Sequence, residues 1–335
     1  MASVCVILYG YAPSPFTSKI ENTLLLKGIS YYKVKVPPVL PRTAISDLLG
    51  ITYRRLPILA IGRDVYCDSS LITVALERQF PPSKRYGTIF PKPKHGGHTQ
   101  TGLVKTLTQQ VENTIIPLTV SLLPWDEFSE SFIQDRASYY GSPVDTKSII
   151  ASRQEDLNTI SSYLHLIEEQ LADGREWLYY TEQAGLADIS FSSIFSWAEG
   201  LAAFGGLITA QRFPNVTAWL KRFRALVDHI SHRQVAPGEL TGYQAAVMIT
   251  TSSYQPLDTI GFDSNDASRI SVKRDDIVSI VPTDTGGLHP TTGKLVALSK
   301  TESVIEVTGY KGVLRCHFPR LNFSLSSAST CLPRS

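Results

Sequence analysis

The sequence has little of what marks the specialised classes of protein. Its four cysteines lie far apart without a CxxC pair, which excludes a disulfide framework and a zinc spacing and predicts reduced thiols. The net charge of +2 lacks the basic excess that binding to phosphate backbones rewards, so nucleic acid is not an expected partner. No apolar run is long enough to cross a bilayer, and the N-terminus has no cationic lead. We therefore expect a cytoplasmic protein that binds no membrane.

The composition is that of a globular protein large enough for several cores. The chain has 335 residues, of which 43% are hydrophobic and 19% charged, a length that favours two or three domains. Residues 1–82 alternate apolar strand-like runs with two amphipathic helical segments, which predicts a short sheet covered by helices. Residues 83–98, rich in proline, glycine and lysine, break this periodicity and are interpreted as a linker.

The remaining chain changes period twice. Residues 99–236 have helical periodicity, with an apolar stripe at Leu103, Leu107, Val111 and Ile115 and a fully apolar segment "ADISFSSIFSWAEGLAAF", and predict an all-α domain with that segment as its central helix. Within residues 237–325, a loop-like stretch from Gly238 to Asp266 precedes four runs of period two, which predict a small β unit. Among these runs, "GGLHPTTGKL" lacks the spacing of a phosphate loop and is interpreted as a hairpin connection. Residues 326–335 are predicted to be disordered.

The stretch "YGYAPSPFTSK" places a hydroxyl where the first strand bends into the first helix. Ser14 suits the N-cap position, and Pro15 suits the first helical position, where its missing N–H costs nothing. The same helix start would stabilise an anion such as a thiolate. Because no cysteine occupies the bend, such a thiolate would have to belong to a ligand, and the Ser14 hydroxyl can donate a hydrogen bond to its sulfur.

Several motifs in order resemble those of the glutathione S-transferases. They are "SPF" at the helix start, "RRLPIL" with a proline opening a strand, "CDSSLITVALERQF", and, in the helical region, "GLADISFSSIFSW" and "FPNVTAWLKRFRAL". The resemblance covers about the first seven tenths of the chain, a span that fits two domains. It implies a thioredoxin-like α/β N-terminal domain followed by the all-α second domain of that family, with the small all-β unit resembling an extension of fungal members.

The resemblance also implies a glutathione site. Pro57 would be cis and would expose the backbone of Leu56 to the cysteinyl part of glutathione. Asp68 and Ser69 would hold the γ-glutamyl end at a helix start, although an ordinary helix cap is the alternative for this pair. Phe16 of the "SPF" motif and Arg55 would also contact glutathione, Arg55 at the glycyl end. Arg54 is the rival of Arg55, and either arginine would otherwise be a solvated charge.

The catalytic position remains open between a serine and a tyrosine. Ser14 matches the position that, in the serine classes, favours a glutathione thiolate, and other classes use a tyrosine near the end of the first strand. Tyr11 is therefore the second catalytic candidate, whereas Tyr9 fits a plain strand residue. Asp188 resembles a buried capping aspartate and is assigned to folding. The histidine pairs in the linker and near residue 230 lack further ligands, so no metal site is predicted.

Two hypotheses of different classes follow. In the first, an enzyme directs glutathione at a hydrophobic conjugated electrophile, a fungal secondary metabolite of polyketide type, and produces either a conjugate or, by addition and elimination, a cis–trans isomer. In the second, a non-catalytic protein keeps the fold for ligand binding or assembly. The resemblance further implies a homodimer. Affinity for glutathione distinguishes the two hypotheses.

Overall fold

The N-terminal part of the chain is a thioredoxin-like α/β domain in the computed structural model, which describes residues 4–328. Its elements are β1 (Val6–Gly10), α1 (Pro15–Lys27), β2 (Tyr32–Lys35), α2 (Thr43–Leu49), β3 (Ile58–Ile61), β4 (Asp64–Cys67) and α3 (Ser69–Gln79). The strands follow the order β2-β1-β3-β4, in which β1 and β2 are parallel and the other pairs antiparallel. Alternate residues of β1 face opposite sides, so that Leu8 packs under α1 and α3 while Ile7 packs under α2. The predicted order of strands and helices is confirmed, with α2 as an additional helix.

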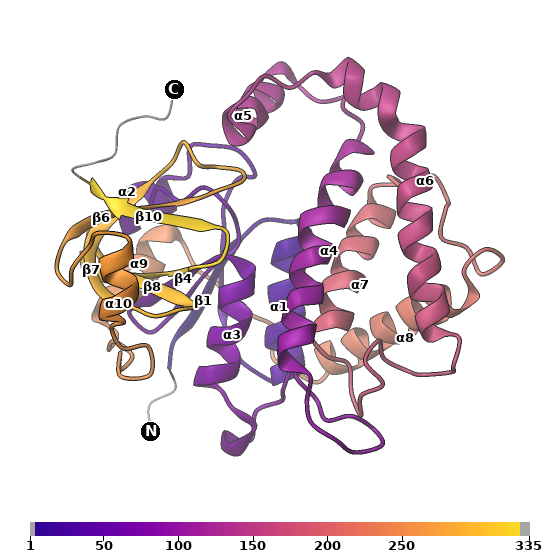
Figure 1. The fold of residues 1–335 in the computed structure, drawn as a ribbon, viewed down its shortest axis with the longest axis horizontal. Coiled ribbons are helices and arrows are strands. Elements are labelled where there is room, and N and C mark those ends of the chain that lie inside the picture. The colour runs from indigo at the N-terminus through magenta and orange to yellow at the C-terminus, as the bar shows by residue number, and fades with distance from the viewer. Residues whose placement is uncertain (1–3, 329–335) are drawn as a thin grey trace.

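The second part is all-helical, as predicted. After a short 3-10 turn (η1, Pro82–Lys84), its helices are α4 (Thr101–Ser121), α5 (Glu130–Tyr140), α6 (Thr146–Leu171), α7 (Leu186–Gly200) and α8 (Pro214–Ser231). Helix α7 is the predicted central helix, since it is buried on most sides and contacts α1, α4 and α8. In Figure 1 α4, α6, α7 and α8 lie to the right of α1, whereas α5 lies above it, toward the sheet. The apolar stripe of α4 differs from the prediction, because Leu103 is 62% exposed and Val104 is buried instead.

The third part contains the predicted strands and two helices that the sequence did not indicate. The elements are β5 (Gly238–Glu239), α9 (Gly242–Thr251), α10 (Ser264–Arg269), β6 (Ile277–Pro282), β7 (Thr291–Leu298), β8 (Glu302–Gly309), β9 (Gly312–Pro319) and β10 (Phe323–Ser327). The predicted loop from Gly238 to Asp266 is wrong for α9, which buries Ala245, Ala246 and Ile249 against the N-terminal sheet and α2. The predicted hairpin connection between β6 and β7 is confirmed by their antiparallel pairing.

The C-terminal strands continue the N-terminal sheet. All ten strands form one sheet in the order β10-β6-β7-β8-β9-β4-β3-β1-β2-β5. Parallel pairing of β4 with β9, in which Val65 faces Cys316, joins the two halves, and β5 extends the opposite edge beside β2. Figure 1 shows the late strands beside the early ones at the left of the molecule. The predicted fold class is confirmed, and the small β unit shares a hydrophobic core with the thioredoxin-like domain.

The end of the described chain corrects one boundary. β10 pairs with β6 through Ser327, so Ser326 and Ser327 are strand residues and not part of a disordered tail. Residues 329–335 of the predicted tail, with Cys331, lie outside the described residues. The other three cysteines are free thiols, as predicted. Between residues 4 and 328, no helix has the length and apolar character needed to span a membrane.

Candidate glutathione site

Ser14 caps the first helix, as its position predicts. Its backbone is extended (φ −144°, ψ 125°), its Oγ accepts a hydrogen bond from the Thr17 N–H at 3.2 Å, and Pro15 begins the helix. The side chain is 3% exposed. A hydroxyl that accepts from a helix N–H still carries its own hydrogen. Ser14 therefore combines a capping role with a donor at the positive end of α1.

Tyr11 and Ser14 belong to one site, whereas Tyr9 does not. Tyr11 lies near the Ser14 hydroxyl and near the guanidinium groups of Arg136 and Arg42. Burial raises the pKa of Tyr11, although both arginines and Ser14 oppose this. Tyr11 is therefore a neutral hydroxyl donor near pH 7. Tyr9 is fully buried in the core of the sheet, which agrees with its interpretation as a strand residue.

The pairing of the strands brings the other predicted residues to the same end of the sheet. Tyr9 faces Ile58 across β1 and β3, and Ile58 faces Cys67 across β3 and β4. The residues just beyond these pairs, Pro57 and Asp68, are therefore neighbours at the edge where β1 turns into α1. The Leu56–Pro57 peptide bond is cis, as the resemblance implies.

Asp68 and Ser69 form the start of α3 and are also linked to α1 and α4. The Asp68 carboxylate caps α3 by accepting from the Ser70 N–H at 2.9 Å. Ser69 accepts from the Lys19 ammonium at 3.2 Å, and Lys19 forms an ion pair with Glu112 of α4. Burial raises the pKa of Glu112, and the charge of Lys19 opposes this. The helix cap proposed as the alternative is present, and it lies beside a buried pair of opposite charges.

Sequence reasoning missed Lys19 and Glu112. Lys19 is 2% exposed although lysine is seldom buried without a partner. The available signal is its spacing, since Lys19 lies four residues after Pro15 and thus on the same face of α1 as the helix start. Glu112 carries no comparable local signal, because its proximity to Lys19 depends on how α4 docks on α1. Phe16 is partly exposed in the first turn of α1.

Arg54 and Arg55 both lie near the predicted site, and each has a carboxylate partner. Arg54 is buried and pairs with Asp135 of α5 at 2.9 Å. Arg55 is partly exposed and pairs with Asp284, which lies in the connection between β6 and β7. Neither arginine is a solvated charge. Arg55, whose side chain is 16% exposed against 1% for Arg54, is the more accessible of the two to solvent.

Aromatic side chains of α5 approach this region. Tyr139 lies under the Arg54 and Arg136 guanidinium groups, each 5.2 Å from the centre of its ring. Arg136 also stacks on Phe132, at 5.0 Å. Phe132 in turn contacts Phe128, and Phe128 contacts Trp125, so these rings form a connected row. Of these rings, Tyr139 is close enough to Tyr11 to affect its pKa.

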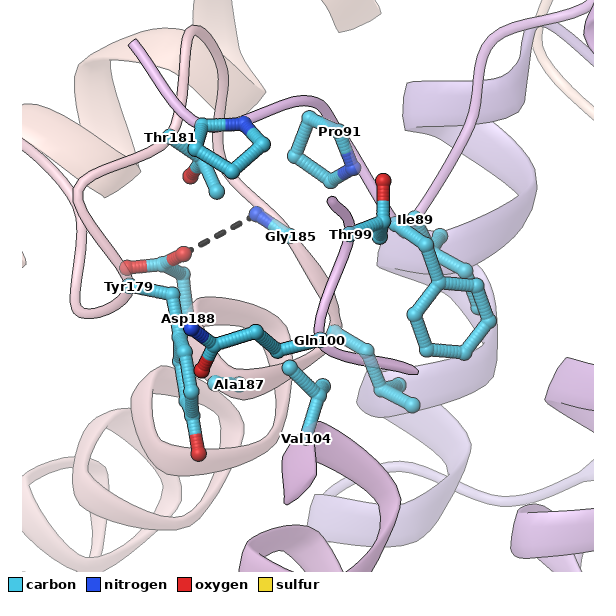
Figure 2. Close-up of a pocket in the computed structure, with 13 residues that line it drawn as sticks. Ile89, Pro91, Thr99, Gln100, Val104, Tyr179, Thr181, Gly185, Ala187 and Asp188 are labelled. Atoms are coloured by element: carbon cyan, nitrogen blue, oxygen red, sulfur yellow. Dashed lines mark hydrogen bonds between the residues drawn. The ribbon is translucent and has the colours of Figure 1, made fainter. Parts of the chain in front are cut away.

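Two cavities differ in their relation to these residues. One of about 200 Å³ lies between α2, residues 51–54 and His289, and its lining includes Arg42 and Arg54. The other, of about 70 Å³, lies where the linker meets the start of α7 (Figure 2) and contains none of the predicted glutathione contacts. Its carboxylate, Asp188, accepts from the Gly185 and Leu178 N–H groups at 2.9 and 3.0 Å and from Trp219. Those bonds support the structural role predicted for Asp188.

Comparison with known proteins agrees with this geometry. Residues 8–84 match a family model described as the glutathione S-transferase N-terminal domain. This family match covers the thioredoxin-like domain. Residues 113–232 of the helical region match a model described as a domain of unknown function, DUF7962. No curated protein matches the chain.

Solved structures show how far the transferase fold extends along this chain. A GST-like protein from Pseudomonas syringae has 23% identity and a TM-score of 0.68, with 98% of this chain and 100% of that chain covered. The Tau class glutathione S-transferase of mango, Mangifera indica, has 15% identity and a TM-score of 0.51, covering 73% of this chain and 98% of its own. Rice GST1, solved in complex with glutathione, has 14% identity and a TM-score of 0.53, covering 75% and 96%. The bacterial protein thus shares almost the whole fold, whereas the plant transferases lack about a quarter of it.

Proposed function

We propose that this protein is a glutathione-dependent enzyme that activates the glutathione thiol for addition to a hydrophobic conjugated electrophile. The observation that carries the proposal is the convergence of Ser14, the Leu56–Pro57 backbone and the Asp68–Ser69 pair at one end of the sheet. Hydroxyl, backbone and helix-start groups of this kind match a peptide thiol with charged ends. Rice GST1, which shares the fold, was solved with glutathione bound.

Each part of glutathione has a proposed partner. The backbone of Leu56 pairs with the cysteinyl part, and the Asp68 carboxylate pairs with the γ-glutamyl ammonium while Ser69 and the start of α3 receive its carboxylate. The sulfur then lies at the start of α1. There the Ser14 hydroxyl donates to the thiolate, and Tyr11 is the second donor.

Activation of the thiol accounts for a small part of the rate. A thiol pKa lowered from ~8.5 to ~6.5 raises the thiolate fraction at pH 7 roughly twentyfold, but the lower basicity reduces nucleophilicity up to about tenfold. Larger accelerations come from holding the electrophile against the sulfur and stabilising the charge that develops on it. We assign this task to Tyr11 and to the aromatic side chains of α5, including Tyr139.

The proposed chemistry has two outcomes that share one step. The thiolate sulfur bonds to a carbon of a conjugated double bond, and the electron pair of that bond moves to the conjugated acceptor. In conjugation, water supplies a proton and the thioether persists. In isomerisation, the resulting single bond rotates and the thiolate leaves again, so no thiol is consumed. We propose a cytoplasmic homodimer acting on polyketide-type secondary metabolites.

The first experiment compares wild type, Ser14→Ala and Tyr11→Phe by titration with glutathione, following bound heat and thiolate ultraviolet absorbance across pH. We expect glutathione bound to wild type to have a lowered thiol pKa. That pKa should rise again in whichever variant, Ser14→Ala or Tyr11→Phe, has lost the hydroxyl that donates to the sulfur. Because Ser14 also caps α1, the matched control is Ser129→Ala, which removes the same kind of cap from α5. That variant should lose about 1 kcal/mol of stability and keep the thiol pKa.

Absence of binding by wild type up to millimolar glutathione would overturn the proposal and favour a protein that keeps the fold for ligand carriage or assembly. If binding is observed, conjugated polyenes are the next substrates, and consumption of thiol per product distinguishes conjugation from isomerisation.

A further inference from the structure

The connection between β6 and β7, residues 283–290, is fixed against the part of the site that would face the glycyl end of glutathione. The Gly286 N–H donates to the Tyr139 carbonyl at 2.7 Å, and the Thr283 N–H donates to the Asn322 carbonyl at 3.0 Å. Gly286 has φ +76°, and an added Cβ would lie 3.2 Å from the Arg54 side chain. The connection is therefore held by α5 and by the strand pair β6 and β10, and its backbone fits closely over Arg54.

The Arg55 guanidinium binds to this connection. Arg55 Nε donates to the Thr285 carbonyl at 3.0 Å, an Nη group donates to the same carbonyl at 2.5 Å, and the guanidinium forms an ion pair with the Asp284 carboxylate. The Arg55 side chain is 16% exposed and that of Asp284 is 50% exposed. The pair thus lies at the border of the site, with one partner in contact with solvent.

The neighbouring residue, Arg54, is also paired with a carboxylate. Arg54 pairs with Asp135 at 2.9 Å, and that carboxylate also accepts from the Leu40 N–H at 3.0 Å. The two arginines that precede Leu56 therefore each face a carboxylate supplied by a distant part of the chain. A second carboxylate brought to Arg55 would meet a guanidinium already paired and a like charge beside it.

We propose that Asp284 takes the place on Arg55 that the carboxylate of a ligand would otherwise take, and thereby determines the specificity of the site at the glycyl end of the thiol cosubstrate. This inference rests on the proposed function, because it presumes that glutathione binds with its glycyl end toward Arg55. Its consequence is a site that accepts the thiol irrespective of charge at that end. The opposite arrangement, in which Asp284 orients Arg55 to receive the glycyl carboxylate, predicts effects of the opposite sign.

The test compares glutathione with its glycyl ethyl ester, which lacks that negative charge, by calorimetric titration. Wild type should bind both within twofold. The variant Asp284→Asn should bind glutathione about threefold to tenfold more tightly and the ester as before, the modest size reflecting a half-exposed ion pair. Adding Arg55→Met to Asp284→Asn should remove the gain.

The matched control is Asp275→Asn, which removes an acid that is 66% exposed elsewhere on the same β unit and should leave both affinities unchanged. Thermal unfolding of each variant shows that it is folded. A wild type that prefers the acid over the ester more than tenfold, with that preference lost in Asp284→Asn, overturns the inference and supports the orienting role. Equal losses for acid and ester in Asp284→Asn also overturn it. Absence of binding of either thiol to any folded variant overturns the proposed function itself.

Discussion

Two of the contacts between the C-terminal β unit and the thioredoxin-like domain differ in burial. At the β4–β9 pairing, which we call the seam, side chains carrying charge are enclosed by the sheet and its neighbours. At the β6–β7 connection, the ion pair of Arg55 and Asp284 lies at a border with solvent. Both places join residues more than 200 positions apart in the chain. The difference between them separates a contact that holds the fold together from one that adjusts a site.

The seam contains a charged network in a dry environment. His317 lies between two carboxylates, with its Nδ1 2.6 Å from Glu302 and its Nε2 2.8 Å from Asp64. Glu302 also receives Arg78, at 2.7 Å. The side chains of His317, Glu302 and Asp64 are 1%, 2% and 0% exposed. A ring whose two nitrogens both face carboxylates is a doubly protonated imidazolium that donates to each, so the four groups carry no net charge.

The exposure of each ion pair determines how much stability is lost when one partner is removed. A buried charge that loses its partner keeps its desolvation cost, so the seam requires all of its members. Around Asp284, water can replace a lost partner, and removal of one charge leaves a solvated group. The expected effects therefore decrease from the seam to the connection.

The largest expected effect follows from removal of His317. In His317→Ala, Asp64 and Glu302 would remain buried as like charges without the group between them, which should cost about 3–5 kcal/mol of unfolding free energy. Urea unfolding followed by circular dichroism measures this loss. His232→Ala, at an exposed position after α8, is the control and should change stability by less than about 0.5 kcal/mol.

A double variant checks the cause. If buried charge is responsible, His317→Ala combined with Asp64→Asn should be more stable than the sum of the two single losses indicates, because fewer uncompensated charges remain. Simple addition of the losses would point to packing around His317 instead.

The second effect is a dependence of stability on pH. Burial lowers the pKa of His317, but its hydrogen bonds to Asp64 and Glu302 outweigh burial and raise that pKa above the ordinary value of 6.5. The native state therefore holds this proton more tightly than the unfolded chain, so its contribution is complete below pH 6.5 and is lost as pH rises through the folded pKa. Urea midpoints across the alkaline range should fall for wild type and change less for His317→Gln.

The same network also predicts that stability decreases at acid pH. Burial raises the pKa of Glu302, but hydrogen bonds from His317 and Arg78 outweigh burial and lower that pKa to about 2. Its contribution to stability is present above the ordinary carboxyl pKa of about 4.3 and is lost as pH falls toward the lowered pKa.

The alkaline prediction has a contradicting outcome. If the urea midpoints of wild type and His317→Gln fall equally as pH rises, a group other than His317 titrates there.

The smallest effect is expected at the connection. Asp284→Asn removes one partner of an ion pair that is half exposed on one side, so the unfolding free energy should change by less than about 1 kcal/mol. The same unfolding experiment measures it, with Asp275→Asn as the control. A loss comparable to that of His317→Ala would contradict the contrast between the two contacts, since it would make the connection part of the structural frame.

Local patterns in the sequence predicted the local parts of this fold. The cap at Ser14 and the start of α1 follow from residue preferences at a helix N-terminus, and strands β6 to β9 follow from period two. Leu56–Pro57 and Asp68–Ser69 came from resemblance, and strand register then explains why they meet. Features that depend on contacts between residues distant in sequence could not be predicted from these local patterns.

His317 illustrates that limit. Period two in the segment "GVLRCHF" predicts that His317 shares a face with Val313 and Arg315, opposite the apolar residues. In the structure β4 covers it instead, with the Tyr66 ring 4.3 Å from the imidazole. Its partners lie in β4 and β8, and the pairing of β4 with β9 leaves no mark in either strand alone. Helix α9 was missed for a related reason, because its alanines show their burial only against α2 and the sheet.

The pairing of β4 with β9 also has a consequence for synthesis of the chain. Asp64 leaves the ribosome 253 positions before His317, a delay of roughly 10–50 s at ordinary elongation rates of about 5–20 residues per second. Throughout that interval the nascent thioredoxin-like domain presents an open strand edge with an acid that later becomes the least exposed in the network. The sheet of the N-terminal domain is therefore completed only after β9 has been synthesised and supplies its missing edge.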